Sequence, residues 1–231
     1  PMAPSTEECR LMIAAALENN VVLFVGHNTR REARFRRMAN MISGGDLGKP
    51  AFAEITFTSP AGLAPRHGGW RYDKSLVPSP GLVQIGIHAI DVLHSLFGPA
   101  MEACAWLRSE DLHDVCLAQF RFPNGLGAHF TSSYTVPRIR KLQVTGTLAS
   151  LGSRTEDTLV LRHEGEDAAR VLEVDRNDTV REEFEEFAEC CRGLRTPLTG
   201  GREGLQAVAV MEAILRSASS GGQTCAVHTD R

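Results

Sequence analysis

Gln84 and His88 are the residues of this chain whose types and spacing most strongly suggest chemistry. After the breaker run at 78–81, apolar residues recur at helical spacing, which predicts an amphipathic helix over about residues 82–97. Because residues four apart share a helix face, Gln84 and His88 should lie together near its start. There His88 could act as a general acid or base, since its ordinary pKa lies near neutral pH and helix-terminal amides stabilise developing negative charge. Gln84 can orient a substrate hydroxyl, although an amide cannot take its proton.

A structural role and a metal site are the alternatives for His88. A lone histidine on an apolar helix is more often a core residue that bonds a backbone carbonyl. A zinc site would combine His88 with Asp91 and His94. At about 100° per residue, however, His94 lies about 120° around the helix from His88, so the sequence predicts no metal site. Asp91 is expected to be structural, as a cap or an ion-pair partner.

A glycine-flanked loop before the helix carries the next candidates. Trp70 and Arg71 follow two glycines directly, and His67 lies just before them. Alone, Trp70 would be a core aromatic residue and Arg71 a surface charge. Together, and just before the helix of His88, they are candidates for contact with a cofactor or substrate.

The segments before this loop predict the end of a doubly wound domain. Ser5 and Glu8 have capping-box spacing and predict a helix to about residue 20, and the apolar run 21–25 predicts a short strand buried in a parallel sheet. A further helix over about 35–42 should end at a pair of glycines. Its other face carries arginines at 31, 34, 36 and 37 and is expected to be solvated. The alternative is that Arg30 or Arg31 reaches a cofactor cleft.

From residue 50 to about 174 the apolar residues alternate with period two, which is typical of strands with one buried face. The predicted strands are 51–58, 101–108, 114–122, 125–135, 139–146, 157–162 and 169–174. Pro123-Asn124-Gly125 predicts a hairpin turn between two of them. The sequence therefore predicts a mostly antiparallel sheet with one inserted helix, which carries His88.

Two helices over about 179–193 and 202–219 close the chain. The predicted buried face of the first consists of Val180, Phe184, Phe187 and Cys191. The expected fold class is α/β (α+β): an open, mainly antiparallel sheet with helices on one face, preceded by the last elements of a Rossmann-type domain. We place the tail of the dinucleotide-binding domain at 1–29, and a C-terminal substrate-binding and oligomerisation domain at 30–231.

Five segments, in order along nearly the whole chain, resemble the glucose-fructose oxidoreductase and inositol dehydrogenase (GFO/IDH/MocA) family. Residues 1–3 resemble the end of its Glu-Lys-Pro motif, and 21–31 resemble its last nucleotide-domain strand with the arginine turn. Trp70 and Arg71 fall at its pair near the nicotinamide, and Gln84 and His88 fall at its Asp-x-x-x-His pair. Residues 180–204 resemble its closing pair of helices.

The resemblance implies a dehydrogenase that uses NAD or NADP and transfers hydride to or from a secondary alcohol of a sugar or cyclitol-like substrate. His88 would take the hydroxyl proton, helped by a lysine expected just upstream, and Gln84 would hold the hydroxyl. Trp70, Arg71 and Asn28 would contact the cofactor, with Trp70 against the nicotinamide. The free face of the sheet would pair with a second subunit, giving a homo-oligomer.

The chain departs from the family pattern in two places. The family usually has an acidic residue where this chain has Gln84, and the amide favours an alternative, a sugar-sensing regulator that keeps the pocket without the chemistry. In addition, no Gly-x-Gly-x-x-Gly motif follows a strand and opens a helix here, so the chain lacks a pyrophosphate cradle. We therefore expect a C-terminal portion of an enzyme, inactive alone, whose cofactor is bound mainly by a preceding domain. A stand-alone binding module is the third alternative.

Composition sets the remaining limits. A net charge of −3 and a pI near 6.3 argue against nucleic-acid and membrane partners. No apolar run approaches the roughly 20 residues that span a bilayer. Six cysteines without Cys-x-x-Cys spacing indicate reduced thiols and a cytoplasmic location.

Overall fold

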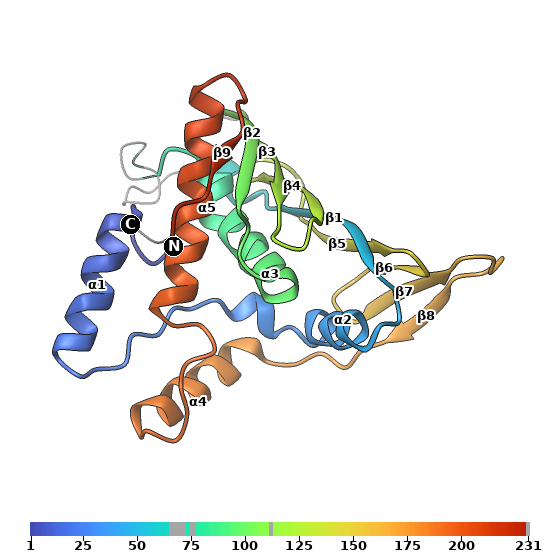
Figure 1. Ribbon diagram of the computed structural model, residues 1–231, viewed down its shortest axis with the longest axis horizontal. Coiled ribbons are helices and arrows are strands. Elements are labelled where there is room, and N and C mark those ends of the chain that lie inside the picture. Colours follow the sequence, from blue (N-terminus) through green and yellow to red (C-terminus); the bar gives the residue numbers. More distant parts are fainter. Residues whose placement is uncertain (65–72, 74–76, 111–112, 230–231) are drawn as a thin grey trace.

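One sheet of nine strands organises the described part of the chain, which is residues 1–64, 73, 77–110 and 113–229 of a computed structural model (Figure 1). The strand order is β8-β7-β6-β5-β1-β4-β3-β2-β9, and all neighbours are antiparallel except β1 and β4, which are parallel. The strands are β1 (Pro50–Thr58), β2 (Glu102–Glu110), β3 (His113–Arg121), β4 (Gly127–Ser133), β5 (Ile139–Gly146), β6 (Ala149–Ser153), β7 (Thr158–His163), β8 (Arg170–Glu173) and β9 (Cys225–Ala226).

The alternation of apolar residues predicted this sheet correctly. All seven predicted strands are present, to within two residues at either end. The hairpin turn is confirmed as well: Gly125 has a φ of +84°, and its amide donates to the carbonyl of Phe122 at 3.0 Å. Two strands were missed. β6 is short and contains a glycine and two serines, and β9 has two residues, so neither carries a strong strand pattern.

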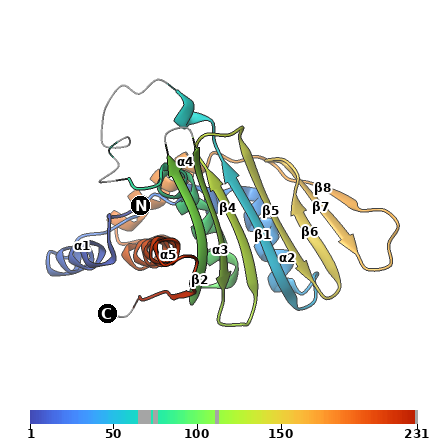
Figure 2. The same cartoon turned by 90° about the horizontal axis from the view of Figure 1, so that it is seen from above.

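Helices cover one face of the sheet. The helices of the described residues are α1 (Thr6–Glu18), η1 (Asn28–Arg31), α2 (Ala33–Gly44), η2 (Ala61–Leu63), η4 (Gly81–Gly86), α3 (Ile87–Phe97), α4 (Thr179–Cys191) and α5 (Gly201–Ser219). Figure 2 shows α2, α3 and α5 on the same side of the sheet, so that the opposite side is open. The prediction of an open, mainly antiparallel sheet with helices on one face is therefore confirmed.

The main core lies between this helical layer and the sheet. Phe57 of β1 and Phe130 of β4 point inward, and they share one apolar cluster with Phe35 of α2, Ile90 of α3 and Ile214 of α5. Each of these side chains is at most 1% exposed. Burial of this kind contributes about 25 cal/mol per Å² of apolar surface. The core thus holds α3, the helix of His88, against the sheet.

The predicted helix boundaries also hold. The Ser5 hydroxyl accepts from the amide of Glu8, so Ser5 caps α1 as expected, but it also donates to the Glu8 carboxylate, and no bond from the Ser5 amide to that carboxylate is found among the described residues. Gly45, with a φ of +85°, ends α2. Asp178 caps α4 by accepting from the amide of Arg181.

The prediction of a buried parallel strand over 21–25 is wrong for this structure. Among the described residues, the only strand-like pairing of this segment is an isolated antiparallel bridge between Phe24 and Gly200. Val21 is 61% exposed, and only Val25 is buried. A parallel strand needs a neighbour on at least one side, and the sheet formed by β1–β9 lies elsewhere. α1 packs against α5 through Cys9 and Val208. The assignment of 1–29 to a separate domain stays a prediction.

The predicted buried face of α4 is wrong too. Phe184 is 67% exposed, Val180 and Phe187 are also largely exposed, and so is Cys191. The residues of this helix that are buried are Glu186 and Cys190. Apolar periodicity identifies the side of a helix that is suited to burial, but it does not identify the part of a protein against which that side packs.

The arginine-rich face was assigned wrongly as solvated. Arg31 and Arg34 are each 1% exposed, whereas Arg36 is 48% exposed and pairs with Glu182. Arg34 is held by the carboxylate of Glu32 and by the carbonyl oxygen of Thr155. A long-range acceptor such as Thr155 gives no local signal in the sequence, so the sequence pattern does not distinguish a buried guanidinium group from a solvated one.

The exposure of α4 can be tested with a matched pair of phenylalanine variants of this chain. We expect Phe184→Ala to change the free energy of unfolding by less than about 0.5 kcal/mol, because the ring is mostly in solvent. Phe130→Ala should cost about 3–5 kcal/mol, because it empties a core site. Urea denaturation of both variants measures the difference. Equal losses would contradict the exposed position of Phe184.

Candidate active site

The helix that carries Gln84 and His88 begins as a π-helix and continues as an α-helix. Gln84 lies in the π-helical stretch η4, and His88 is the second residue of α3. His88 is therefore about two turns from the helix start, not in its first turn. The amide of Gly81, at that start, donates to the carboxylate of Asp114. The prediction that free helix-terminal amides lie beside His88 is wrong, because these amides are already used. π-Helical turns of this kind are frequent at functional sites.

Two glycines allow this π-helical stretch to lie directly on the sheet. A Cβ atom at Gly81 would come within 2.9 Å of the Cα of Ser133, and one at Gly86 within 2.9 Å of the ring of Phe130. Both neighbours belong to β4. Real Cβ atoms essentially never come that close, so only glycine fits at these two positions without a shift of the neighbouring backbone at Gly81 or of the neighbouring side chains at Gly86. Gln84, between them, is consequently held at a fixed height above the strand.

Asp114 of β3 anchors the start of the same stretch. Its carboxylate accepts from the Ser79 hydroxyl at 3.0 Å, from the amide of Gly81 and from the amide of Tyr134 at 3.2 Å. The side chain is 3% exposed. Burial raises the pKa of Asp114, and these hydrogen bonds oppose that rise. Asp114 thus ties together the residues before the helix, its first amide and the end of β4.

Gln84 and His88 each present a buried nitrogen without a hydrogen-bond partner among the described residues. These atoms are Nε2 of Gln84 and Nδ1 of His88, and both side chains are half-buried. Buried polar groups in native proteins are nearly always bonded, so an unpartnered one indicates a ligand, a water or a functional strain. A core histidine would bond a backbone carbonyl through its ring, and no such bond of His88 is found within the described ranges.

Burial changes the acid–base properties of His88. Burial, followed by the neighbouring His27 and Arg140, lowers the pKa of His88 to about 4, whereas Asp91 opposes this shift. The expectation that His88 would titrate near neutral pH is therefore corrected. At pH 7 the ring is neutral, which is the form that can accept a proton.

The Arg30 side chain joins the segment before α2 to the helix of His88. Its Nε and Nη2 atoms donate to the two carboxylate oxygens of Asp91 at 2.7 and 2.5 Å. Arg30 is 9% exposed and Asp91 is 1% exposed. Burial raises the pKa of Asp91, and the bond to Arg30 opposes that rise. The structural role expected for Asp91 is that of an ion-pair partner, and the alternative that Arg30 reaches into a cofactor cleft is replaced by this pair.

His27 lies beside the same pair. Its ring meets the ring of His88 edge to face, with 6.1 Å between the centroids. Its Nε2 atom is 3.9 Å from a carboxylate oxygen of Asp91, and burial together with Arg30 lowers its pKa to about 3. Sequence reasoning missed His27. In the sequence, His27 lies between the apolar run 21–25 and two arginines. This position does not indicate that His27 contacts His88, which is 61 residues further along the chain.

Of the three residues proposed for cofactor contact, the structure describes only Asn28. Asn28 begins η1, and its side-chain amide donates to the hydroxyl of Thr179 at 3.1 Å. Trp70 and Arg71 lie outside the described residues, as does His67. Their contact with a cofactor stays a prediction.

His94 is used within the fold. Its Nε2 atom accepts from the amide of Ala100 at 3.2 Å, and burial lowers its pKa to about 3. Within the described ranges there is no group of three or more histidine, cysteine or acidic side chains that could hold a metal ion. All six cysteines lie in these ranges and are free thiols.

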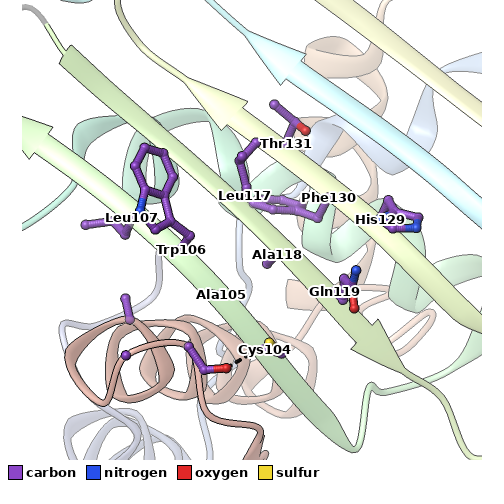
Figure 3. Close-up of a pocket in the computed structure, with 13 residues that line it drawn as sticks. Cys104, Ala105, Trp106, Leu107, Leu117, Ala118, Gln119, His129, Phe130 and Thr131 are labelled. Atoms are coloured by element: carbon purple, nitrogen blue, oxygen red, sulfur yellow. Dashed lines mark hydrogen bonds between the residues drawn. The ribbon is translucent and has the colours of Figure 1, made fainter.

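A second concave region lies on the open face of the sheet. Figure 3 shows this hollow, of about 630 Å³, over β2, β3 and β4. The register of the three strands places Trp106, Leu117 and Thr131 in one row, and Cys104, Gln119 and His129 in the next. These rows point away from the helical layer that carries His88. The hollow is therefore distinct from the site of Gln84 and His88.

Comparison with known protein families decides the broader identity. The model of the GFO/IDH/MocA C-terminal domain matches residues 35–152, which is 118 of the 231 residues. This chain belongs to the GFO/IDH/MocA family. The match covers β1 to β5, η4 and α3, so it includes the helix with Gln84 and His88.

Relatives of this GFO/IDH/MocA chain are oxidoreductases named for sugar substrates. It is 27% identical to 1,5-anhydro-D-fructose reductase of Ensifer adhaerens, over 96% of this chain and 69% of that protein. It is 24% identical to D-xylose 1-dehydrogenase [NADP(+)] of Haloarcula marismortui, over 95% of this chain and 64% of that protein. The structure of levoglucosan dehydrogenase in complex with NADH has the same fold, with a TM-score of 0.86, 19% identity and coverage of 99% of this chain and 72% of the other.

No helix among the described residues is long and apolar enough to cross a membrane.

The close approach of the π-helical stretch to β4 can be tested with two glycine variants of this GFO/IDH/MocA chain. We expect Gly81→Ala to destabilise the fold by about 1–3 kcal/mol, because the new Cβ would overlap Asp114 and Ser133. Gly44→Ala is the control, since nothing lies within 4 Å of its Cβ, and it should be neutral or stabilising by up to about 1 kcal/mol. Urea denaturation measures both. A Gly81→Ala variant as stable as Gly44→Ala would rule out the described contact.

Proposed function

We propose that this chain is the substrate-binding and proton-transferring part of a nicotinamide-dependent oxidoreductase. The reaction is hydride transfer to or from a secondary alcohol of a sugar or cyclitol-like substrate, with NAD or NADP. The observation that carries this proposal is the pair of buried, unpartnered nitrogens on Gln84 and His88, on a helix fixed from both sides. The names of the relatives support a sugar substrate.

In this mechanism His88 handles the proton. An alcohol that loses hydride must also lose its hydroxyl proton, and a base within hydrogen-bond reach has to receive it. His88 is neutral at pH 7, so its free lone pair can accept that proton. Gln84 holds the hydroxyl in place through its side-chain amide, which stays neutral throughout. When bound, the nicotinamide ring supplies the hydride chemistry.

The cofactor is expected to be bound mainly by residues outside this chain. The glycines at the start of α5 cannot cradle a phosphate, because a Cβ at Gly201 would meet Ile13 and one at Gly204 would meet Met2 and Val25. Their space is filled by protein. The chain spans 64–69% of the length of the two curated relatives, and the exposed apolar residues of α4 offer a surface for a further part of the protein. Asn28, Trp70 and Arg71 are proposed to contact the nicotinamide end.

A sugar-sensing regulator is the second candidate. It is favoured by Gln84, which cannot take a proton where the family usually has an acidic residue. Such a protein would bind sugar through the same unpartnered nitrogens without turnover. Turnover by the full-length protein therefore separates the two candidates.

We expect His88→Ala in the full-length protein to lower kcat by about 10²–10⁴-fold with a small change in KM, because a general base acts in the chemical step. Gln84→Ala should mainly raise KM, since a neutral amide contributes about 0.5–1.5 kcal/mol per hydrogen bond in ground state and transition state alike. Steady-state kinetics with NAD and NADP on sugar alcohols and aldoses measures both.

The pH profile provides an internal control for this experiment. Because His88 must be unprotonated to act as a base and its pKa is lowered to about 4, kcat/KM for oxidation should stay high down to about pH 5 and fall below it. His88→Ala should lose this acidic limb. If His88→Ala folds normally and keeps kcat within a few-fold of the wild type, His88 is structural and the regulator becomes the preferred function.

We also propose that two copies pair through the open face of the sheet. Trp106 is 55% exposed and Leu117 is 44% exposed, and they are neighbours across β2 and β3 in the hollow on that face (Figure 3). Exposed apolar patches that include tryptophan are typical of interfaces. A second copy would cover them.

We expect Trp106→Asp to convert the oligomer to a monomer, because it places a charge in the apolar centre of the proposed interface. Leu148→Asp is the control, since Leu148 is similarly exposed but lies in the turn between β5 and β6. Sedimentation velocity over a range of concentrations measures the change. A wild type that is monomeric throughout, or equal effects of the two variants, would contradict this interface.

A further inference from the structure

His27 is a buried side chain whose polar atoms have no assigned use. It is 3% exposed, and neither ring nitrogen has a hydrogen-bond partner in the described part of the chain. Its closest acidic oxygen, on Asp91, is 3.9 Å from Nε2, which is too far for a hydrogen bond. A fully unpartnered buried imidazole destabilises the fold, so a partner or a function is needed to explain it.

The position of His27 indicates the function. Its ring meets the ring of His88 edge to face at 6.1 Å, and Nδ1 of His88 is itself buried without a partner among the described residues. Two adjacent histidines thus have unpartnered nitrogens in one place, beside the buried pair of Arg30 and Asp91.

We propose that His27 is a positioning residue for His88: it accepts the Nδ1 proton of His88 and so keeps Nε2 of His88 free to take the proton of the substrate. This inference rests on the function proposed above. A neutral imidazole has one N–H and one lone pair, and which nitrogen carries the proton is set by the bond that the other nitrogen makes. At 6.1 Å between centroids, the nitrogens of the two rings are too far apart for a direct hydrogen bond, so the contact runs through one bridging water.

The other groups that face His88 cannot take this role. Arg30 from η1 and Arg140 from β5 have donors only. Asp91, on the same helix as His88, is held by Arg30 through both carboxylate oxygens, and no hydrogen bond between Asp91 and His88 is found among the described residues. His27 remains as the neutral acceptor, since burial and Arg30 lower its pKa to about 3 and leave a lone pair free at pH 7.

The reaction makes this acceptor more important. When the substrate proton moves to Nε2, His88 becomes a cation and both of its nitrogens are donors. A hydrogen bond from an ionised donor is stronger than one between neutral groups. The contact to His27 is therefore stronger after proton transfer than before it, which is the condition under which an interaction accelerates the chemical step.

Three variants test this inference. His27→Phe keeps a planar ring but removes both nitrogens, and His27→Asn places an amide oxygen near the position of Nδ1. His163→Phe, at the end of β7, is the control for loss of a histidine remote from the site. Imidazole ¹⁵N chemical shifts of the 231-residue chain report the tautomer of His88, and steady-state kinetics of the full-length protein report kcat and KM. Thermal unfolding checks that each variant is folded.

We expect wild-type His88 to carry its proton on Nδ1, and His27→Phe to give a mixture of the two tautomers. The kcat of His27→Phe should fall on the order of 10- to 100-fold, with KM within about twofold, because one charge-assisted hydrogen bond is lost. His27→Asn should restore most of both signals, and His163→Phe should change neither. A folded His27→Phe variant with the wild-type tautomer and kcat would overturn the proposal.

The tautomer measurement separates this inference from the proposed function. It needs neither cofactor nor turnover, so it reports on His27 even if His88→Ala proves that His88 is not the base. A shifted tautomer with unchanged kcat would mean that the contact exists but does not serve catalysis, and this also overturns the role proposed for His27.

Discussion

The buried ion pair between Arg30 and Asp91 joins two segments that are 61 residues apart, and the geometry of the proposed site depends on it. It holds η1 against α3, and in doing so it sets the distance between the rings of His27 and His88. Removing one partner of such a pair typically costs about 3–5 kcal/mol, because the other charge stays buried alone. The next residue, Arg31, binds in the opposite direction, to Glu186 of α4. Two consecutive arginines therefore fix one short segment to two different helices.

Two strands of the sheet, β3 and β4, also hold the proposed site in place. β4 accepts the π-helical stretch because positions 81 and 86 are glycines, and Asp114 of β3 bonds the first amide of that stretch. Gln84 and His88 thus lie on helical elements rather than on loops, which is the arrangement that keeps reacting groups within a fraction of an ångström. The open face of the sheet takes no part in this support, so its side chains are free to serve an interface.

The sequence predicts the elements well and their partners poorly. Alternation with period two gives seven of the nine strands, and the local capping pattern at Ser5 gives a helix start, because the deciding contacts lie within a few residues. The buried state of Arg31 and Arg34 depends on acceptors more than 100 residues away, so no local pattern shows it. The buried face of α4 was predicted wrongly for a related reason. Apolar residues do lie along one side of this helix, but the described residues do not cover them. His88 was found by its motif, whereas His27 is identified only by its contacts.

The electrostatics of the site also bear on the role of Gln84. A carboxylate at this position would favour protonated His88 through its negative charge, and an amide has no such effect. With burial, His27 and Arg140 all lowering its pKa, His88 is held neutral at pH 7. In the proposed reaction, a neutral histidine suits alcohol oxidation, in which the base receives a proton, and a protonated one suits carbonyl reduction, in which it gives one. In the proposed reaction, an amide at position 84 therefore differs from a carboxylate in charge as well as in hydrogen bonding, because it does not favour the protonated form of His88.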